Sequence, residues 1–276
     1  MTHFLNKVAV VTGAGSGIGR ALALDLAHQG ARLALSDVDS AGLAETVRQC
    51  EVLGAEVKAD HLDVAERSSV LAYSDEVRAY FGVVNLVFNN AGIAFSGDIE
   101  VSEFKDVERV MDVDFWGVVN GTKAFLPHLI ASGDGHIINT SSLFGLLAMP
   151  SQSAYCAAKF AVRGFTESLR QEMLISKHPV RVTSVHPGGI KTAIARNSTA
   201  AAGQDAKVLA EFFDKKMART TPESAAHTIL RGVRAGRPRV LVGVDARVLD
   251  ALVRVTGSGY QRLIAAVAAR VLPTGQ

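Results

Sequence analysis

Short apolar runs alternate with longer amphipathic segments along most of this chain, and this alternation restricts its possible folds more than any other feature. The expected strands are Lys7–Val11, Ala31–Ser36, Ala55–Asp60, Val83–Phe88, Gly135–Thr140, Val180–Val185 and Arg239–Val242. The expected helices are Ile18–Gln29, Ala41–Leu53, Ser68–Phe81, Glu103–Ser132, Ser153–Ser176, Ala206–Met217 and Pro222–Ala235. Because parallel strands need a crossover, usually through a helix, this order predicts an α/β fold with a doubly wound parallel sheet of about seven strands. Helices should cover both faces of that sheet, as in Rossmann-like domains.

Size and composition favour a single domain over residues 1–276. Of the 276 residues, 48% are hydrophobic and 20% are charged, which is enough for one large core but not for two comfortable ones. A net charge of +2 without a basic run argues against nucleic acid as a partner. No apolar run approaches the roughly 18 residues of a transmembrane helix.

The two cysteines, Cys50 and Cys156, are far apart and belong to no CxxC pair or histidine cluster. We therefore expect neither a disulfide framework nor a metal site. The stretch Met1–Lys7 is too short for a signal peptide before the first strand. Reduced thiols in such a protein fit a cytoplasmic location.

Four glycines follow the first expected strand and open the first expected helix, in the segment TGAGSGIG at Thr12–Gly19. A side chain there would hold the backbone away from a pyrophosphate, and a helix N-terminus offers N–H groups to an anion. We expect the phosphates of a dinucleotide to bind at this turn. The candidate cofactor-binding residues of the turn are Gly13, Gly15, Ser16, Gly17, Ile18 and Gly19.

Asp37 follows the second expected strand. A carboxylate there can accept hydrogen bonds from both ribose hydroxyls of adenosine and repels a 2′-phosphate, which favours NAD over NADP. Arg20 is the counter-evidence, because a nearby cation could bind that phosphate. The non-functional alternative for Asp37 is a solvated carboxylate or local cap at the end of a strand.

Ser142, Tyr155 and Lys159 form a second chemical group. Tyr155 and Lys159 are four residues apart on one expected helix, so their side chains share a face. A free tyrosine has a pKa of about 10, and a neighbouring cation favours its ionised form. Tyr155 could then take the proton of an alcohol, or return it to a carbonyl, while Ser142 hydrogen-bonds the same oxygen. We interpret the chain as an enzyme that moves hydride between a nicotinamide cofactor and a small-molecule alcohol or ketone.

These residues, in this order and spacing, resemble the short-chain dehydrogenase/reductase family over about Lys7 to Val244. By that resemblance, the further cofactor-binding residues are Asp63, Val64, Asn90, Ala91, Gly92, Tyr155, Lys159, Pro187, Gly188, Ile190 and Thr192. In the family, the first two contact adenine, the NNAG segment steadies the sheet and lines the cofactor, and the segment ending at Thr192 holds the nicotinamide carboxamide. The matching lysine also holds the nicotinamide ribose.

One position departs from the family pattern. The family usually has Asn at the position of Asp114, and by the resemblance that Asn completes a proton relay by ordering a water near the lysine. We expect the enzyme to be active all the same, with Asp114 as a catalytic residue beside Lys159. Cys156 and His186 flank motif residues, and we expect both to be structural.

The sequence says less about the substrate. Leu143–Pro150 is almost wholly apolar, which fits a hydrophobic alcohol or ketone and equally fits core packing. By the resemblance, residues 193–220, with Phe212, Phe213 and Met217, form a lid over the substrate.

Residues 245–276 extend beyond the core of the family as a helical segment. Tyr260, Leu263 and Ile264 could share one face of it, together with Val267 and Val271. We expect this face to cover a subunit interface or the pocket, with peripheral membrane contact as the alternative.

The resemblance also implies a homodimer or homotetramer built on Glu103–Ser132 and Ser153–Ser176. Two other functions stay open. One is the same chemistry with NADP, as a carbonyl reductase. The other is a non-catalytic dinucleotide-binding sensor, for which Asp114 is the only support.

Overall fold

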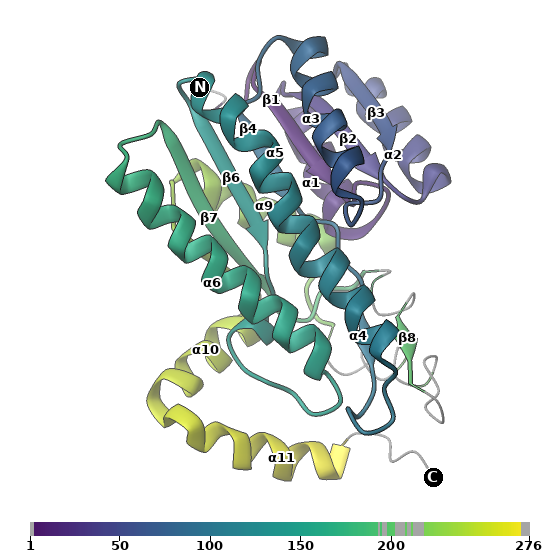
Figure 1. Ribbon diagram of the computed structural model, residues 1–276, viewed down its shortest axis with the longest axis vertical. Coiled ribbons are helices and arrows are strands. Elements are labelled where there is room, and N and C mark those ends of the chain that lie inside the picture. The colour runs from purple at the N-terminus through teal and green to yellow at the C-terminus, as the bar shows by residue number, and fades with distance from the viewer. Residues whose placement is uncertain are drawn as a thin grey trace.

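The chain folds around one parallel sheet (Figure 1). In this computed structural model, which describes residues 3–192, 194, 198–201, 208, 211 and 218–271, the sheet has seven strands. They are β1 (Val8–Thr12), β2 (Arg32–Asp37), β3 (Val57–His61), β4 (Leu86–Asn89), β6 (Gly135–Thr140), β7 (Val180–Pro187) and β9 (Arg239–Val242). Their order is β3-β2-β1-β4-β6-β7-β9, and every neighbouring pair is parallel. The predicted doubly wound fold is confirmed, and the strand order reverses between β1 and β4.

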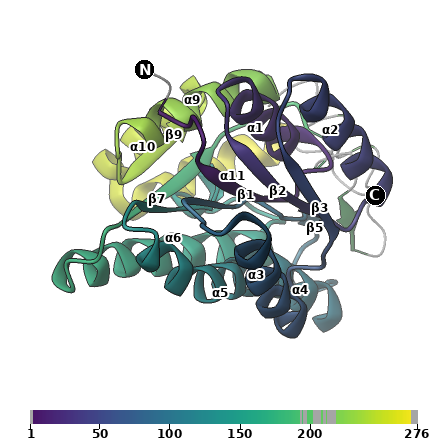
Figure 2. The same ribbon diagram turned by 90° about the horizontal axis from the view of Figure 1, so that it is seen from above.

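Helices cover both faces of the sheet. They are α1 (Gly17–His28), α2 (Ser40–Val52), α3 (Arg67–Phe81), α4 (Phe104–Met111), α5 (Gly117–Ala131), α6 (Ser153–Ile175), α9 (Pro222–Arg234), α10 (Val244–Thr256) and α11 (Tyr260–Val271). Seen from above, α1, α2 and α9 lie on one face, and α3, α5 and α6 lie on the other (Figure 2). Within the described part of the chain, no helix combines the length and apolarity that crossing a membrane requires.

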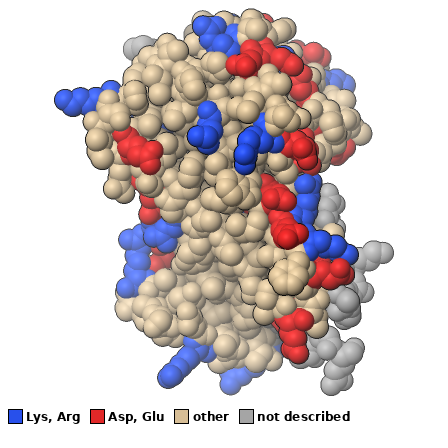
Figure 3. Space-filling view, in the orientation of Figure 1, with Lys and Arg blue, Asp and Glu red and all other residues tan. Residues whose placement is uncertain are grey.

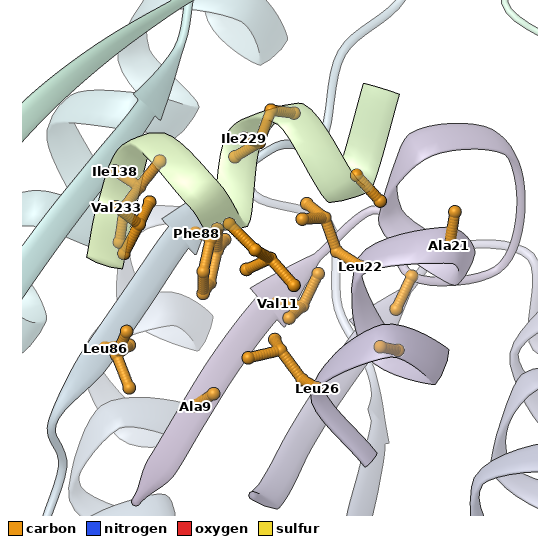
Figure 4. Close-up of a cluster of buried hydrophobic side chains, with 14 of the residues drawn as sticks. Ala9, Val11, Ala21, Leu22, Leu26, Leu86, Phe88, Ile138, Ile229 and Val233 are labelled. Atoms are coloured by element: carbon orange, nitrogen blue, oxygen red, sulfur yellow. The ribbon is translucent and has the colours of Figure 1, made fainter. Parts of the chain in front are cut away.

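The two faces of each buried strand pack against different helices. Val11 and Phe88 point to one face, where they cluster with Leu22 of α1 and with residues of α9 (Figure 4). Their neighbours Val10 and Val87 point the other way and cluster with residues of α3, α5 and α6. Both faces of these strands are therefore dry, which is why the strands read as continuous apolar runs.

The expected helix Glu103–Ser132 is one helical run, but it is not uniformly α-helical. A π-helical turn at Asp112–Trp116 separates α4 from α5. Pro127, where we expected a disturbance, lies inside α5 without ending it. Single π-helical turns are frequent at functional sites, and this one contains Asp114.

One further feature was not predicted, and two expected segments lie largely outside the described residues. A small parallel sheet of β5 (Phe95–Ser96) and β8 (Thr199–Ala200) was not predicted, because two-residue strands show no periodicity. The expected helix Ala206–Met217 and most of the expected lid at 193–220 lie outside the described residues. The last helical segment forms α10 and α11, which meet at the turn Gly257–Gly259.

Candidate active site

The glycine-rich turn lies at the carboxyl end of β1, where the strand order reverses. Gly13 has a φ of 66°, and a Cβ there would come 2.8 Å from the Cα of Ala91. A Cβ on Gly19 would clash with the carbonyl of Gly13. Gly17 begins α1, and its Cβ would lie 3.1 Å from Cγ2 of Thr192. The close approach of these backbones requires glycine, and the N-terminus of α1 at this turn favours a bound phosphate.

Asp37 lies beside this turn at the end of β2. Its Oδ2 accepts a hydrogen bond from the Gly15 N–H at 2.7 Å, and its Oδ1 accepts one from the Asp39 N–H at 2.9 Å. Arg20 donates to the carbonyls of Gly15 and Gly42. The guanidinium of Arg20 is therefore engaged by the protein, while two carboxylates stand at the end of β2.

Hydrogen bonds fix the segment after β4 against the glycine turn. The Nδ2 of Asn90 donates to the Thr12 carbonyl at 3.0 Å, and the Thr12 hydroxyl accepts the N–H groups of Asn90 and Ala91, each at 3.0 Å. The buried Asn89 donates to Oδ1 of Asn139 at 2.8 Å, which ties β4 to β6. The expected steadying of the sheet therefore has a physical basis in these amides.

Asp63 and Val64 follow β3. The Asp63 carboxylate accepts the Ala65 N–H at 3.0 Å and pairs with Arg109 of α4 at 2.9 Å. Val64 is buried against Gly117, where a Cβ would come 2.6 Å from Cγ2 of Val64. These contacts set the direction in which both side chains leave the end of β3.

The segment Pro187–Thr192 begins at the end of β7 and reaches the glycine turn with its last residue. Asp245, in the first turn of α10, accepts the N–H of Gly189 at 2.7 Å. The Asp245 carboxylate also fills the space that a side chain on Gly188 would need, and Ile190 is buried. Asp245 was not predicted as a site residue, because no local pattern links a helix start to a turn 56 residues earlier.

The structure brings Ser142, Tyr155 and Lys159 together. Tyr155 and Lys159 lie one turn apart on α6, and Ser142 follows β6 in an extended conformation. The Nζ of Lys159 is 5.4 Å from the centroid of the Tyr155 ring. The Ser142 hydroxyl accepts the Phe144 N–H at 3.1 Å and lies close enough to the Tyr155 hydroxyl to influence its pKa. Two hydroxyls and one ammonium therefore meet near the carboxyl end of β6.

Asp114 and Lys159 form a buried ion pair. Their side chains are 0% and 3% exposed, and Asp114 Oδ2 lies 3.2 Å from Lys159 Nζ. The other carboxylate oxygen, Oδ1, accepts the Ile93 N–H at 2.8 Å. Burial lowers the pKa of Lys159, but the charges of Asp114 and Tyr155 outweigh burial, so this pKa lies above its ordinary value. Burial raises the pKa of Asp114, and Lys159 opposes that rise.

The pKa of Tyr155 corrects one expectation. The sequence predicted that Lys159 would make the phenol more acidic, and Lys159 does act in that direction, as does the nearby hydroxyl of Ser142. Desolvation by the surrounding protein is the larger effect, and the charge of Asp114 adds to it, so the pKa of Tyr155 is raised above its ordinary value. This desolvation depends on how distant segments pack, so it was not predicted from the sequence.

His186 holds the backbone of Ser142. Its Nδ1 donates to the Ser142 carbonyl at 2.9 Å, so its Nε2 accepts from the Ser184 hydroxyl at 2.9 Å. Burial lowers the pKa of His186 to about 4, which leaves the ring neutral at pH 7. The imidazole is thus a fixed donor behind Ser142, in line with the structural role that we expected.

An apolar wall lies beside the Tyr155 ring. Phe144 meets that ring edge-on, with the centroids 6.2 Å apart. Leu147 packs with Tyr260 of α11, whose hydroxyl accepts the Ala148 N–H at 3.0 Å. The helices α10 and α11 therefore cover the loop that follows β6. Of the other residues expected to line an apolar pocket, Phe212, Phe213 and Met217 lie outside the described residues.

Known proteins share this sequence and architecture. The family model for short chain dehydrogenase matches residues 7–203. A protein of Mycobacterium tuberculosis named oxidoreductase SadH is 66% identical over 273 residues, which cover 99% of both chains. The cyclohexanol dehydrogenase of an Acinetobacter species is 34% identical, over 93% of both chains. The crystal structure of a short chain dehydrogenase/reductase from Burkholderia phymatum in complex with NAD has a TM-score of 0.86 at 31% identity, over 93% of this chain and 95% of that one.

Proposed function

The chain belongs to the short-chain dehydrogenase/reductase family of oxidoreductases, and on that premise we propose an NAD-dependent reaction on a hydrophobic secondary alcohol or ketone. The observation that carries the proposal is the placement of Tyr155 one helical turn from Lys159 and beside Ser142. This grouping supplies an acid or base, a cation that favours the ionised base, and a donor for the substrate oxygen.

We assign the proton transfer to Tyr155. In alcohol oxidation its phenolate oxygen takes the proton of the substrate hydroxyl, and in ketone reduction its hydroxyl returns that proton. Ser142 donates a hydrogen bond to the same substrate oxygen and stabilises the charge that develops on it. Lys159, kept protonated by Asp114, favours the phenolate. When bound, the nicotinamide supplies the hydride chemistry at the substrate carbon.

The proposed cofactor site runs from the glycine turn to the segment after β7. Backbones approach closely there, and a Cβ on Gly13 would fill the space between them. The proposed contacts outside the glycine turn are Asp37, Asp63, Val64, Asn90, Ala91, Gly92, Tyr155, Lys159, Pro187, Gly188, Ile190 and Thr192.

We propose NAD as the cofactor because of the charges at the end of β2. Asp37 and Asp39 would repel a 2′-phosphate, and the donors of Arg20 are directed to backbone carbonyls. The NAD complex of the Burkholderia relative supports the same choice. Fluorescence titration with NAD and NADP tests it, and tight NADP binding without NAD binding would overturn it.

The ring of Phe144 beside Tyr155 supports a hydrophobic substrate, and the cyclohexanol dehydrogenase relative supports a secondary alcohol. A panel of secondary alcohols that differ in polarity, followed by NADH absorbance, tests the reaction, with Tyr155→Phe as the inactive control. NAD binding without turnover on the whole panel would favour a dinucleotide-binding sensor instead. Turnover by Tyr155→Phe at the wild-type rate would refute the assignment of the base.

We also propose a homodimer or homotetramer built on α5 and α6. The outward face of α6 carries uncharged exposed residues such as Ala157, Phe160 and Gly164, and Figure 3 shows a broad uncharged surface there. Light scattering tests the proposal, with Phe160→Glu as the variant that should dissociate the oligomer. A wild-type monomer would reject it. A cytoplasmic location stays a prediction.

A further inference from the structure

Helices α10 and α11 form one end of the molecule, far from α2 and α3 (Figure 1). One face of α10 packs inward through Ala246. The opposite face carries Val244, Val248 and Val255, which are 73%, 59% and 86% exposed. Their spacing of four and seven residues places them in one stripe along the helix. A stripe of exposed valines is therefore turned away from the core.

The same end of the molecule is basic. Residues 251–271 contain Arg254, Arg262 and Arg270 and no Asp or Glu. Asp245 of α10 holds the turn after β7 and Asp250 offsets the charge of Arg254, so the excess positive charge of this end comes from Arg247, Arg262 and Arg270. Lys and Arg side chains project from this lower end in Figure 3.

A basic hollow borders the valine stripe. Its volume is about 390 Å³, it lies between α9, β9 and α10, and Arg231, Arg237, Arg239 and Arg247 line it. Arg239 is in ion pairs, whereas the other three guanidinium groups have no carboxylate partner among the described residues. Arg247 lies three residues after Val244 on α10, and residues three apart are neighbours on a helix surface, so cationic and apolar groups adjoin there.

We propose that this end of the molecule docks on a membrane surface containing anionic phospholipids. The valines of the stripe enter the boundary between headgroups and acyl chains, and the arginines meet the headgroup phosphates. A second copy of the chain fits this surface less well. A two-fold contact would bring Arg262 and Arg270 against a patch whose helices offer no free carboxylate.

Docking does not depend on the proposed reaction, so its test uses no activity readout. The full chain is sedimented with vesicles of phosphatidylcholine alone and of phosphatidylcholine mixed with phosphatidylglycerol. We expect binding only to the mixed vesicles, and we expect salt to weaken that binding because it screens exposed charges.

Two variants and two matched controls locate the surface. Arg247→Gln should weaken binding to the mixed vesicles about fivefold, because it removes one cation near an anionic surface. Val255→Glu should weaken binding roughly tenfold or more, because it removes apolar contact and adds like charge. The controls Arg78→Gln on α3 and Val52→Glu on α2 alter equally exposed side chains at the far end and should bind as the wild type does. Circular dichroism and thermal unfolding of every variant establish that it is folded.

Several results would overturn the proposal. Absence of sedimentation with mixed vesicles at low salt is one, and wild-type binding by Val255→Glu is another. Calorimetric binding of inorganic phosphate without any vesicle binding would assign the hollow to a free anion. Dissociation of an oligomer by Val255→Glu, again without vesicle binding, would assign the valine stripe to a second copy of the chain.

Discussion

Replacing Asp114 with asparagine tests the buried ion pair, because the change removes one charge and keeps the shape of the side chain. Both neighbours of the carboxylate are donors, namely the Ile93 N–H at 2.8 Å and the Lys159 ammonium at 3.2 Å. The carboxylate accepts a hydrogen bond from Ile93 with one oxygen and forms an ion pair with Lys159 through the other, whereas an amide has one oxygen and one NH₂ group. In the variant the NH₂ group must face one of the two donors, so one of them loses its partner.

The separation of the charges sets the size of the effect. Two unit charges 3.2 Å apart attract by about 5 kcal/mol at an effective dielectric constant of about 20. Removing one member of a buried pair leaves the desolvation of the other uncompensated, which usually costs about 3 to 5 kcal/mol. We therefore expect the free energy of unfolding of Asp114→Asn to lie about 3 kcal/mol below that of the wild type, measured by urea denaturation. Asp112→Asn, an exposed change in the same π-helical turn, is the control and should have little effect.

The same substitution acts on the proposed base. The charge of Asp114 raises the pKa of Tyr155, so its removal lowers that pKa. The pH at which alcohol oxidation reaches half its maximal rate should then move down, because less alkaline solution suffices to form the phenolate. NADH formation across pH, at saturating alcohol, measures the displacement.

Equal stability and an unchanged pH profile in Asp114→Asn would refute this reasoning. A profile displaced to higher pH would show that Lys159 loses its proton in the variant, which would also contradict the direct action of Asp114 on Tyr155. A gain in turnover by orders of magnitude would show that the carboxylate impairs the natural enzyme.

Four other predictions follow from single contacts. Tyr155→Phe should lower kcat for oxidation by roughly 10²–10⁴-fold with NAD affinity retained, by steady-state kinetics and fluorescence titration. Asp37→Ser should improve NADP affinity relative to NAD by roughly tenfold, seen in their dissociation constants, because a like charge is removed. The pKa of His186 is lowered from 6.5 to about 4, so its contribution to the free energy of unfolding is complete above pH 6.5 and is lost as pH falls towards 4. That loss is about 3 kcal/mol. Urea unfolding across pH should show that the free energy of unfolding falls less with decreasing pH in His186→Asn than in the wild type. Tyr260→Phe leaves the Ala148 N–H without its acceptor and should lower the free energy of unfolding by about 1 to 3 kcal/mol. In steady-state kinetics with an apolar alcohol, the variant should raise KM by a larger factor than it changes kcat.

Most of the fold could be predicted because its elements leave local periodic signals. The strands Gly135–Thr140 and Arg239–Val242 begin and end where the apolar runs do, and α6 ends one residue before its expected end. The π-helical turn at Asp112–Trp116 left no such signal, because it alters hydrogen bonding without altering which residues are apolar.

The candidate site likewise has features that local spacing predicts and features that it does not. Tyr155 and Lys159 could be paired from their spacing alone, since one helical turn joins them. The desolvation that raises the pKa of Tyr155, and the hydrogen bond from Ala148 to Tyr260, depend on segments that meet only in the folded chain. Contacts of that kind carry no periodicity, so the sequence alone could not predict them.

Asp245 connects α10 to the turn after β7, which we propose as part of the cofactor site. The carboxylate belongs to α10, yet it holds the N–H of Gly189 and occupies the space beside Gly188. Anything that displaces α10 when it binds there must therefore disturb the turn after β7. Coupled binding equilibria are reciprocal. If binding at α10 changes the affinity for the dinucleotide by some factor, the dinucleotide changes the affinity of that binding by the same factor.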